Sequence, residues 1–156
     1  KAVRIRAHSA ADPFTVEKIV CPHDDAGGAK RGMNTIHVLH AFGEKIVHMG
    51  DVGCPLPEEA MEKLRGALVL LIPVGGFYTI DAEQAKEYVD RIMPDIVIPM
   101  HYREKGKRLD VDKVDDFCDL FEEEEVENEG ESEIEISRED LGGDSTKIIV
   151  MERVED

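Results

Sequence analysis

Three short segments of the chain each place a potential metal ligand directly after a probable strand. The ligands are His23, Asp51 and His101, within Cys21-Pro22-His23, Gly50-Asp51-Val52-Gly53 and Pro99-Met100-His101-Tyr102. A side chain at a strand end is held by the rigid scaffold behind it, as a metal centre requires. Two neutral imidazoles and one carboxylate suit Zn²⁺, Mn²⁺ or Fe, so the three residues could form part of a mononuclear or dinuclear site.

Each of these residues also has an ordinary structural explanation. A lone histidine is more often structural than a ligand, and an aspartate between glycines is often a turn residue. Spacing alone therefore favours a metal site only slightly. The remaining histidines outside these segments, His8, His37, His40 and His48, are interpreted as structural.

Several neighbours of the candidate ligands could support the site. His48 precedes Asp51 by three positions and could orient its carboxylate. Cys54 could supply a thiolate ligand, although a small buried side chain is the more frequent role of such a cysteine. Three more residues are close enough in sequence to contact an anionic group of a substrate: Arg31, Asn34 and Tyr102.

The elements that must position these side chains follow from the periodicity of the sequence. Alternating or continuously apolar runs predict strands, and an apolar face with a period of 3.6 residues predicts a helix. The predicted strands are 3–7, 15–21, 34–40, 44–49, 67–74, 95–99 and a terminal pair at 134–136 and 147–151. The predicted helices are 57–64, 81–93 and 110–121. Strands that alternate with helices indicate a layered α/β protein.

The charge of the chain is concentrated in its last third. The net charge is −16, with 15 acidic and 15 basic residues in 1–109 but 20 acidic and 4 basic residues in 110–156. An acidic chain is a poor nucleic-acid binder, because phosphate contacts require Lys and Arg. The glutamate-rich segment 119–133 is predicted to be a solvated acidic linker, with a partner- or cation-binding segment as the alternative.

Cysteine number and hydropathy indicate a cytoplasmic protein. The three scattered cysteines form no CxxC pair and favour reduced thiols. The longest apolar run, 67–74, is far shorter than the roughly 20 residues that cross a bilayer, and no secretory signal opens the sequence. A chain of 156 residues that is 42% hydrophobic is expected to form one domain with a buried core.

The order His23, Gly50-Asp51, His101 is similar to the last three ligand motifs of the metallo-β-lactamase superfamily. The surrounding residues resemble the branch of small prokaryotic Zn-dependent hydrolases related to L-ascorbate-6-phosphate lactonase. Five segments carry the resemblance: His23-Asp24-Asp25-Ala26-Gly27-Gly28, Arg31-Gly32-Met33-Asn34-Thr35, His48-Met49-Gly50-Asp51-Val52-Gly53, Ile72-Pro73-Val74-Gly75-Gly76-Phe77-Tyr78-Thr79-Ile80-Asp81-Ala82 and Pro99-Met100-His101-Tyr102. The resemblance as a whole runs from about Val3 to the last strand.

The resemblance implies an αββα sandwich with the metals at one edge, between the sheets. It implies that His23 binds the first metal, that Asp51 bridges both metals and takes part in catalysis, and that His101 binds the second. The implied reaction is hydrolysis of an ester, lactone, amide or phosphodiester by a metal-bound hydroxide. The implied metal is divalent, with Zn²⁺ first and Mn or Fe as alternatives.

One motif of that superfamily is absent from the sequence. The His-x-His-x-Asp-His motif supplies its remaining ligands, and His8 in Ala7-His8-Ser9 does not match it. The chain is therefore expected to be the C-terminal part of such a protein, a partial sandwich that lacks its N-terminal strands and exposes an apolar sheet face.

Two function classes remain open besides the hydrolase acting on a small-molecule substrate. The first is a truncated, non-catalytic remnant that binds metal weakly or assembles with another chain through its open sheet face. The second is an interaction module that works through the acidic segment. The sequence predicts no membrane association and permits a homo-oligomer.

Overall fold

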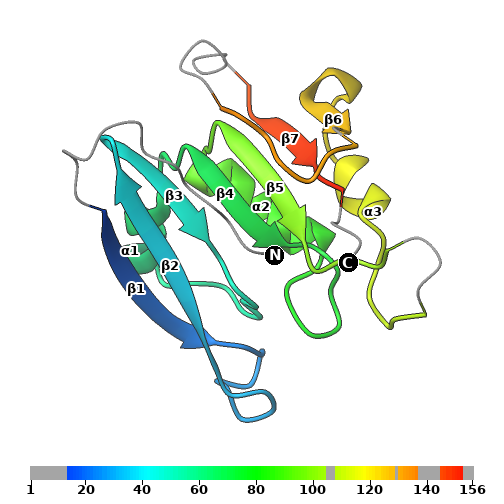
Figure 1. Cartoon of the computed structure of the whole chain (residues 1–156). Helices are drawn as coiled ribbons and strands as arrows, with labels where there is room; N and C mark the ends of the chain where they lie inside the picture. Colours follow the sequence, from blue (N-terminus) through cyan, green and yellow to red (C-terminus); the bar gives the residue numbers. More distant parts are fainter. Residues whose placement is uncertain (1–13, 105–107, 129, 137–144, 153–156) are drawn as a thin grey trace.

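The computed structural model describes residues 14–104, 108–128, 130–136 and 145–152. These residues form one seven-stranded sheet in the order β1-β2-β3-β4-β5-β7-β6 (Figure 1). Three strands pair antiparallel and the rest pair in parallel, so the sheet is mixed. Along the chain, strands and helices alternate from β3 to β5, as expected of a layered α/β protein.

The antiparallel part of the sheet comes from the first third of the chain. It contains β1 (Thr15–Pro22), β2 (Met33–Ala41) and β3 (Glu44–His48). Phe42 and Gly43 join β2 to β3 with φ values of 55° and 80°. Two consecutive positive φ values match the two-residue turn that suits the twist of a hairpin. The strands predicted at 15–21, 34–40 and 44–49 are confirmed.

The parallel part of the sheet forms the centre of the molecule. It contains β4 (Val69–Pro73) and β5 (Ile96–Met100), in which all ten residues are buried, followed by β7 (Lys147–Val150) and β6 (Val126–Asn128). Continuous burial explains why these two strands are apolar throughout and do not alternate. Because β1, β3, β4 and β5 run in the same direction, their carboxyl ends lie at one edge of the sheet.

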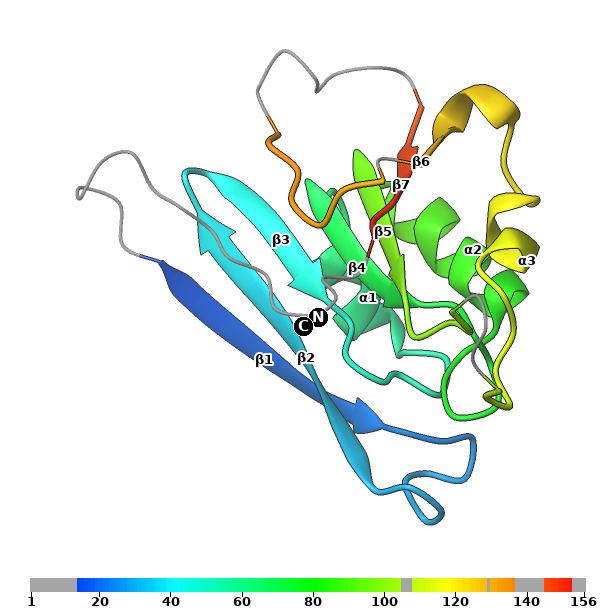
Figure 2. The ribbon, with the colours of Figure 1, turned by 45° about the vertical axis from the view of Figure 1, so that its right-hand side comes forward.

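Helices cover one face of this sheet (Figure 2). They are α1 (Glu58–Leu64), α2 (Ala82–Ile92) and the short α3 (Asp115–Cys118). Helix α2 begins at the predicted capping box, in which Asp81 accepts from the Gln84 backbone N–H and the Gln84 side chain accepts from the Asp81 backbone N–H. The main core packs between this helix layer and the sheet and includes Leu64, Val89 and Phe117.

The opposite face of the sheet carries a second apolar cluster. Its buried members lie on β4, β5 and β7, and Ile134, Ile136 and Met151 pack against it. This part of the face is therefore covered, so the apolar face that was expected to be exposed is exposed only in part. The same face remains open over β1, where Val16 and Val20 are 54% and 63% exposed. Within the described residues there is one sheet and one helix layer, which is half of an αββα sandwich.

The last third of the chain differs most from its sequence-based expectation. The helix predicted at 110–121 shortens to α3, because the backbone of Asp112 pairs with Gly75 and Arg103 and not with a helical turn. The predicted acidic linker 119–133 contains the 3₁₀-helix η1 (Glu123–Glu125) and strand β6, whose Val126 packs against the main core.

The two segments predicted as a terminal strand pair, 134–136 and 147–151, do not pair with each other. Strand β7 lies between β5 and β6, while 134–136 contributes side chains to the second cluster without forming a strand. The strand predicted at 3–7 lies outside the described residues. None of the described helices combines the length and apolar character needed to cross a membrane.

Candidate functional site

The three predicted ligands meet at the carboxyl edge of the sheet. His23 follows β1, Asp51 lies three residues past β3, and His101 follows β5. The Nε2 atom of His23 lies 3.8 Å from Oδ2 of Asp51, and the Nε2 atom of His101 lies 3.8 Å from Oδ1. Asp51 therefore stands between the two imidazoles, with one carboxylate oxygen facing each ring. Its side chain is 51% exposed, so solvent reaches the site.

The His23 ring is fixed through one nitrogen, and its other nitrogen has no partner. Nδ1 lies 3.4 Å from the carbonyl oxygen of Arg31, to which it can donate a hydrogen bond. In that tautomer Nε2 keeps its lone pair. This Nε2 atom is buried and has no hydrogen-bond partner within the described structure, although the Asp51 carboxylate lies beyond it. A metal-ligating histidine has the same organisation, because its second nitrogen is held by a carbonyl or carboxylate.

Asp24 builds the loop that carries both His23 and Arg31. Its carboxylate is 2% exposed and accepts four backbone N–H groups, with Oδ1 bound to Ala26 and Gly28 and Oδ2 bound to Lys30 and Arg31. The N–O distances are 2.7–3.0 Å. Desolvation would raise the pKa of this carboxyl group, but the four donors lower it to about 2. Asp24 is therefore an ionised carboxylate that holds the loop together, and its oxygens are already bound to backbone N–H groups and are not available to a metal.

Asn34 and His48 hold the turn that presents Asp51. Asn34 accepts from the Asp51 backbone N–H at 2.9 Å and donates to the carbonyl of Met49 at 2.9 Å. Nδ1 of His48 accepts from the Gly50 N–H at 3.1 Å, which requires that nitrogen to be unprotonated. Burial, as the largest contribution, lowers the pKa of His48. Both side chains bind backbone atoms of the turn and not the Asp51 carboxylate.

Two glycines allow the backbones of the histidine ligands to approach neighbouring loops. A Cβ on Gly53 would overlap the carbonyl of His23, and a Cβ on Gly75 would overlap the carbonyl of His101. Neither neighbour is the end of a flexible side chain, so the overlap could be relieved only by moving the ligand's own backbone. His101 itself has a φ of 57°, which is uncommon for a residue with a side chain and is typical of functional sites.

Tyr102 and Cys54 lie near the ligands in sequence but face other parts of the structure. The Tyr102 hydroxyl group lies 3.5 Å from the carbonyl of Met151 and its ring packs against the main core. Burial raises the pKa of the Cys54 thiol, and its Sγ lies 3.7 Å from the carbonyl of Pro22. A thiol that donates to a carbonyl is not poised to be a thiolate ligand.

The spacing of the donor atoms is compatible with divalent metal binding. Two donors about 2.0–2.2 Å from one ion lie roughly 3–4 Å apart, and both 3.8 Å pairs fall in this range. Across the described residues, however, no three His, Cys, Asp or Glu side chains already surround one point as a closed metal site. The arrangement is a row, with the carboxylate in the middle and an imidazole at each end. These residues fit an ion beside each imidazole and leave room for further ligands.

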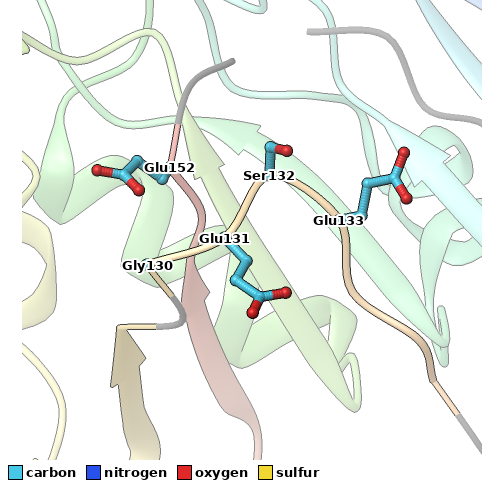
Figure 3. A pocket seen from close by; sticks show the side chains of 5 residues that line it. All are labelled: Gly130, Glu131, Ser132, Glu133 and Glu152. Atoms are coloured by element: carbon cyan, nitrogen blue, oxygen red, sulfur yellow. The ribbon is translucent and has the colours of Figure 1, made fainter. Parts of the chain in front are cut away.

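A second group of acidic residues lies far along the chain but is not organised as a site. Gly130, Glu131, Ser132, Glu133 and Glu152 line a hollow of about 390 Å³. Figure 3 shows the Glu131, Glu133 and Glu152 side chains pointing in different directions. Because their carboxylates do not converge, this hollow lacks the geometry of a cation site.

The chain belongs to the β-lactamase superfamily. The profile of the β-lactamase superfamily domain matches residues 4–101, which is more than half of the chain. This match confirms the superfamily expected from the motifs, and the fold of related structures confirms the metallo-β-lactamase-like α/β class.

Proteins with a similar sequence are named metal-dependent hydrolases. A UPF0173 metal-dependent hydrolase from Thermoplasma acidophilum is 34% identical over 87 residues, which are 56% of this chain and 39% of that protein. Another from Ignicoccus hospitalis is 36% identical over 73 residues, 46% of this chain and 31% of that protein. The chain therefore spans less than half the length of these relatives.

A solved structure has the same arrangement over most of the chain. It is a proposed Zn-dependent hydrolase of the metallo-β-lactamase superfamily from Thermotoga maritima, with a TM-score of 0.74 and 32% identity. The likeness covers 88% of this chain and 64% of that one.

Sequence reasoning did not assign a role to several residues that shape the site. They are Asp24, Gly53, Gly75, Phe77 and Tyr78. Asp24 had a recognisable signal, because an aspartate before Gly27-Gly28 favours side-chain to backbone bonds in a loop. The close approaches at Gly53 and Gly75 had none, since they join residues that are distant along the chain.

Proposed function

We propose that this chain provides the second half of a metal-dependent hydrolase site, with His23, Asp51 and His101 as metal ligands. The observation that carries the proposal is the buried, unpartnered Nε2 of His23, which faces Asp51 while Nδ1 is held by the Arg31 carbonyl. A buried imidazole nitrogen without a partner is costly unless a ligand completes it. The names of the relatives and the superfamily membership support the same function.

The proposed role of each residue follows from its place in the row. His23 and His101 would each hold one ion through Nε2, and Asp51 would hold both through its two oxygens. A bound divalent ion would supply a water of lowered pKa and would polarise the oxygen of the bond to be broken. Asn34 and His48 would keep Asp51 in position through the backbone. Imidazole-rich ligation favours Zn²⁺, with Mn or Fe as alternatives.

The substrate bond in this proposal is an ester, lactone, amide or phosphodiester. All four have an oxygen that a metal ion can polarise, and the fold hosts many chemistries. The ligands in this chain number three, so the complete activity is proposed for a protein that supplies further ligands.

Metal content of the purified chain tests the ligand assignment. We expect zinc to bind, and its affinity to fall at least about 10-fold in His23→Ala and in His101→Ala, because each variant removes one of the two donors, a histidine and Asp51, proposed for one ion. His40→Ala is the matched control, since His40 lies on β2 away from the row. Mass spectrometry of the dialysed proteins gives the stoichiometry. Equal zinc affinity in all four proteins would refute the assignment.

A non-catalytic remnant is the second candidate. It is favoured by the row geometry, in which no three described side chains yet close around one ion. Under this alternative, zinc binds weakly to the purified chain, and a longer protein that contains this chain together with the further ligands does not hydrolyse esters, lactones, amides or phosphodiesters. Hydrolysis by that longer protein, and its loss in Asp51→Ala, would instead support the metal-dependent hydrolase.

A further inference from the structure

An arginine beside the proposed metal centre is held in place by the site's own loop. The Arg31 backbone N–H donates to Asp24 at 2.7 Å, and its carbonyl accepts from His23. Arg31 thus shares one rigid loop with a proposed metal ligand. A side chain projecting from such a loop has a fixed origin relative to the metal centre.

The Arg31 guanidinium rests on two aromatic rings that come from a different loop. Its Cζ atom lies 5.2 Å from the ring centre of Tyr78 and 5.9 Å from that of Phe77. The two rings contact each other edge to face at 4.6 Å, and the Tyr78 ring lies 6.5 Å from the His101 ring. The arginine and the aromatic pair therefore form a continuous surface that ends at the proposed metal centre.

The aromatic loop combines a strained backbone with exposed rings. Phe77 has a φ of 57°, and the Tyr78 N–H donates to the carbonyl of Gly76 at 2.7 Å across it. A bond between residues two apart around a positive φ is a strained tight turn. Phe77 and Tyr78 are nevertheless 62% and 42% exposed, so the strain is not compensated by burial of these rings. Strain of this kind clusters at ligand-binding sites.

The guanidinium has no carboxylate partner among the described residues. Arg65 and Arg91, in contrast, both pair with Glu58 on the surface. Among the described residues, the Arg31 side chain contacts the two rings. Its planar set of N–H donors can therefore donate two hydrogen bonds to one carboxylate or phosphate group.

We propose that Arg31, Phe77 and Tyr78 form a substrate-recognition ledge for an anionic group joined to an apolar or aromatic portion. The inference rests on the proposed hydrolase function and deepens it by naming the substrate class. Arg31 binds the anion, which is a carboxylate or a phosphate. Phe77 supplies a face against which the apolar portion packs. The bond to be hydrolysed then lies next to His101.

Binding of stable anions tests this ledge without requiring turnover. The probes are phenylphosphonate and methylphosphonate, which share the anion and differ in the ring, together with benzoate, which shares the ring. Isothermal titration calorimetry is performed on the chain with and without zinc. The variants are Arg31→Gln, Arg31→Lys and Phe77→Ala. Arg65→Gln is the matched control, because it removes an arginine on the far side of the fold, at the end of α1.

The ledge predicts a distinct pattern of losses. Arg31→Gln weakens both phosphonates by about 10-fold or more, the scale of a charge-assisted hydrogen bond. Arg31→Lys retains part of the affinity, which excludes unfolding as the cause. Phe77→Ala weakens phenylphosphonate by roughly 3- to 10-fold and leaves methylphosphonate unchanged. Arg65→Gln binds as the wild type does, and zinc content is equal in all variants. Benzoate binding relative to phenylphosphonate tells whether the anion is a carboxylate or a phosphate.

Other outcomes separate the ledge from the metal centre. Unchanged phosphonate affinity in Arg31→Gln, or no binding by the wild type, would overturn the ledge and leave the metal assignment standing. Anion binding that depends on Arg31 in a chain that takes up no zinc would support the ledge, and would show that His23, Asp51 and His101 do not bind zinc without the further ligands.

Discussion

At the scale of single residues, the site consists of ligands and of the groups that hold them. Asp51 faces both histidines at 3.8 Å, but its direction is set by Asn34 and His48 through backbone bonds. Asp24 has the corresponding role for His23, because it organises the loop from which His23 and Arg31 extend. Such supporting groups commonly change metal affinity by about 10- to 100-fold when removed.

Asp24→Asn tests this supporting role. The amide can accept through one oxygen only, so at least two of the four backbone N–H groups lose their partner. We expect zinc affinity to fall by about 10-fold or more and thermal stability to decrease. Asp25→Asn is the control, because its neighbouring carboxylate is exposed and pairs with Lys30. Calorimetry of zinc binding gives both affinities, and equal values would contradict the role of Asp24.

At the scale of elements, parallel and antiparallel pairing together place the ligands at one edge. The hairpin β2–β3 reverses the chain, so β1 and β3 run parallel to β4 and β5. The loops then pack closely through their backbones, because Gly75 contacts the His101 backbone and Gly53 contacts the His23 backbone. The sheet thus fixes the positions of the loops, and the two glycines permit the contacts between them.

Gly75→Ala is expected to damage the site through the backbone. The added methyl group overlaps the His101 carbonyl, so the ligand must move. We predict a loss of zinc affinity of at least about 10-fold and a destabilisation of about 1–3 kcal/mol. Gly66→Ala is the control, because a Cβ there meets open space, although its φ of 69° still carries a local cost. If both variants bind zinc equally, the close approach at Gly75 does not position His101.

At the scale of the whole molecule, charge and core are separated. The helix layer and the sheet enclose the main core, while most of the net charge of −16 belongs to the segment after Leu109. Part of that segment, at 134–136, packs on the second face of the sheet. A dense set of like charges is therefore attached directly to the folded body, where mutual repulsion opposes compactness.

Salt should stabilise this molecule as a whole. Raising NaCl from about 0.02 M to about 0.5 M shortens the screening length and weakens repulsion among the acidic residues, so the Tm should rise. Replacement of the four residues Glu122–Glu125 by glutamine should raise the Tm at low salt and reduce its dependence on salt. Thermal unfolding followed by circular dichroism provides the measurement. A Tm that falls with added salt would show that attractive ion pairs outweigh the repulsion.

Much of the fold follows from the sequence alone. The apolar runs at β4 and β5, the Asp81–Gln84 capping box and the Phe42-Gly43 turn depend on neighbouring residues, so local rules identified them. The resemblance of the His23, Asp51 and His101 motifs to the metallo-β-lactamase superfamily also implied a site at one edge of the sheets. Composition likewise showed that the negative charge lies in the last third of the chain, and periodicity predicted the layered α/β class.

The remaining features were decided by contacts between distant parts of the chain. The Asp112 backbone pairs with Gly75, so the segment before Val114 does not form a helix. Val126 packs against the main core, so part of the glutamate-rich segment forms a strand. The orientation of His23, the glycine contacts and the stacking of Arg31 on Phe77 and Tyr78 likewise join separate loops. Sequence patterns report local preferences, whereas these features arise because tertiary packing brings together groups with no fixed spacing along the chain.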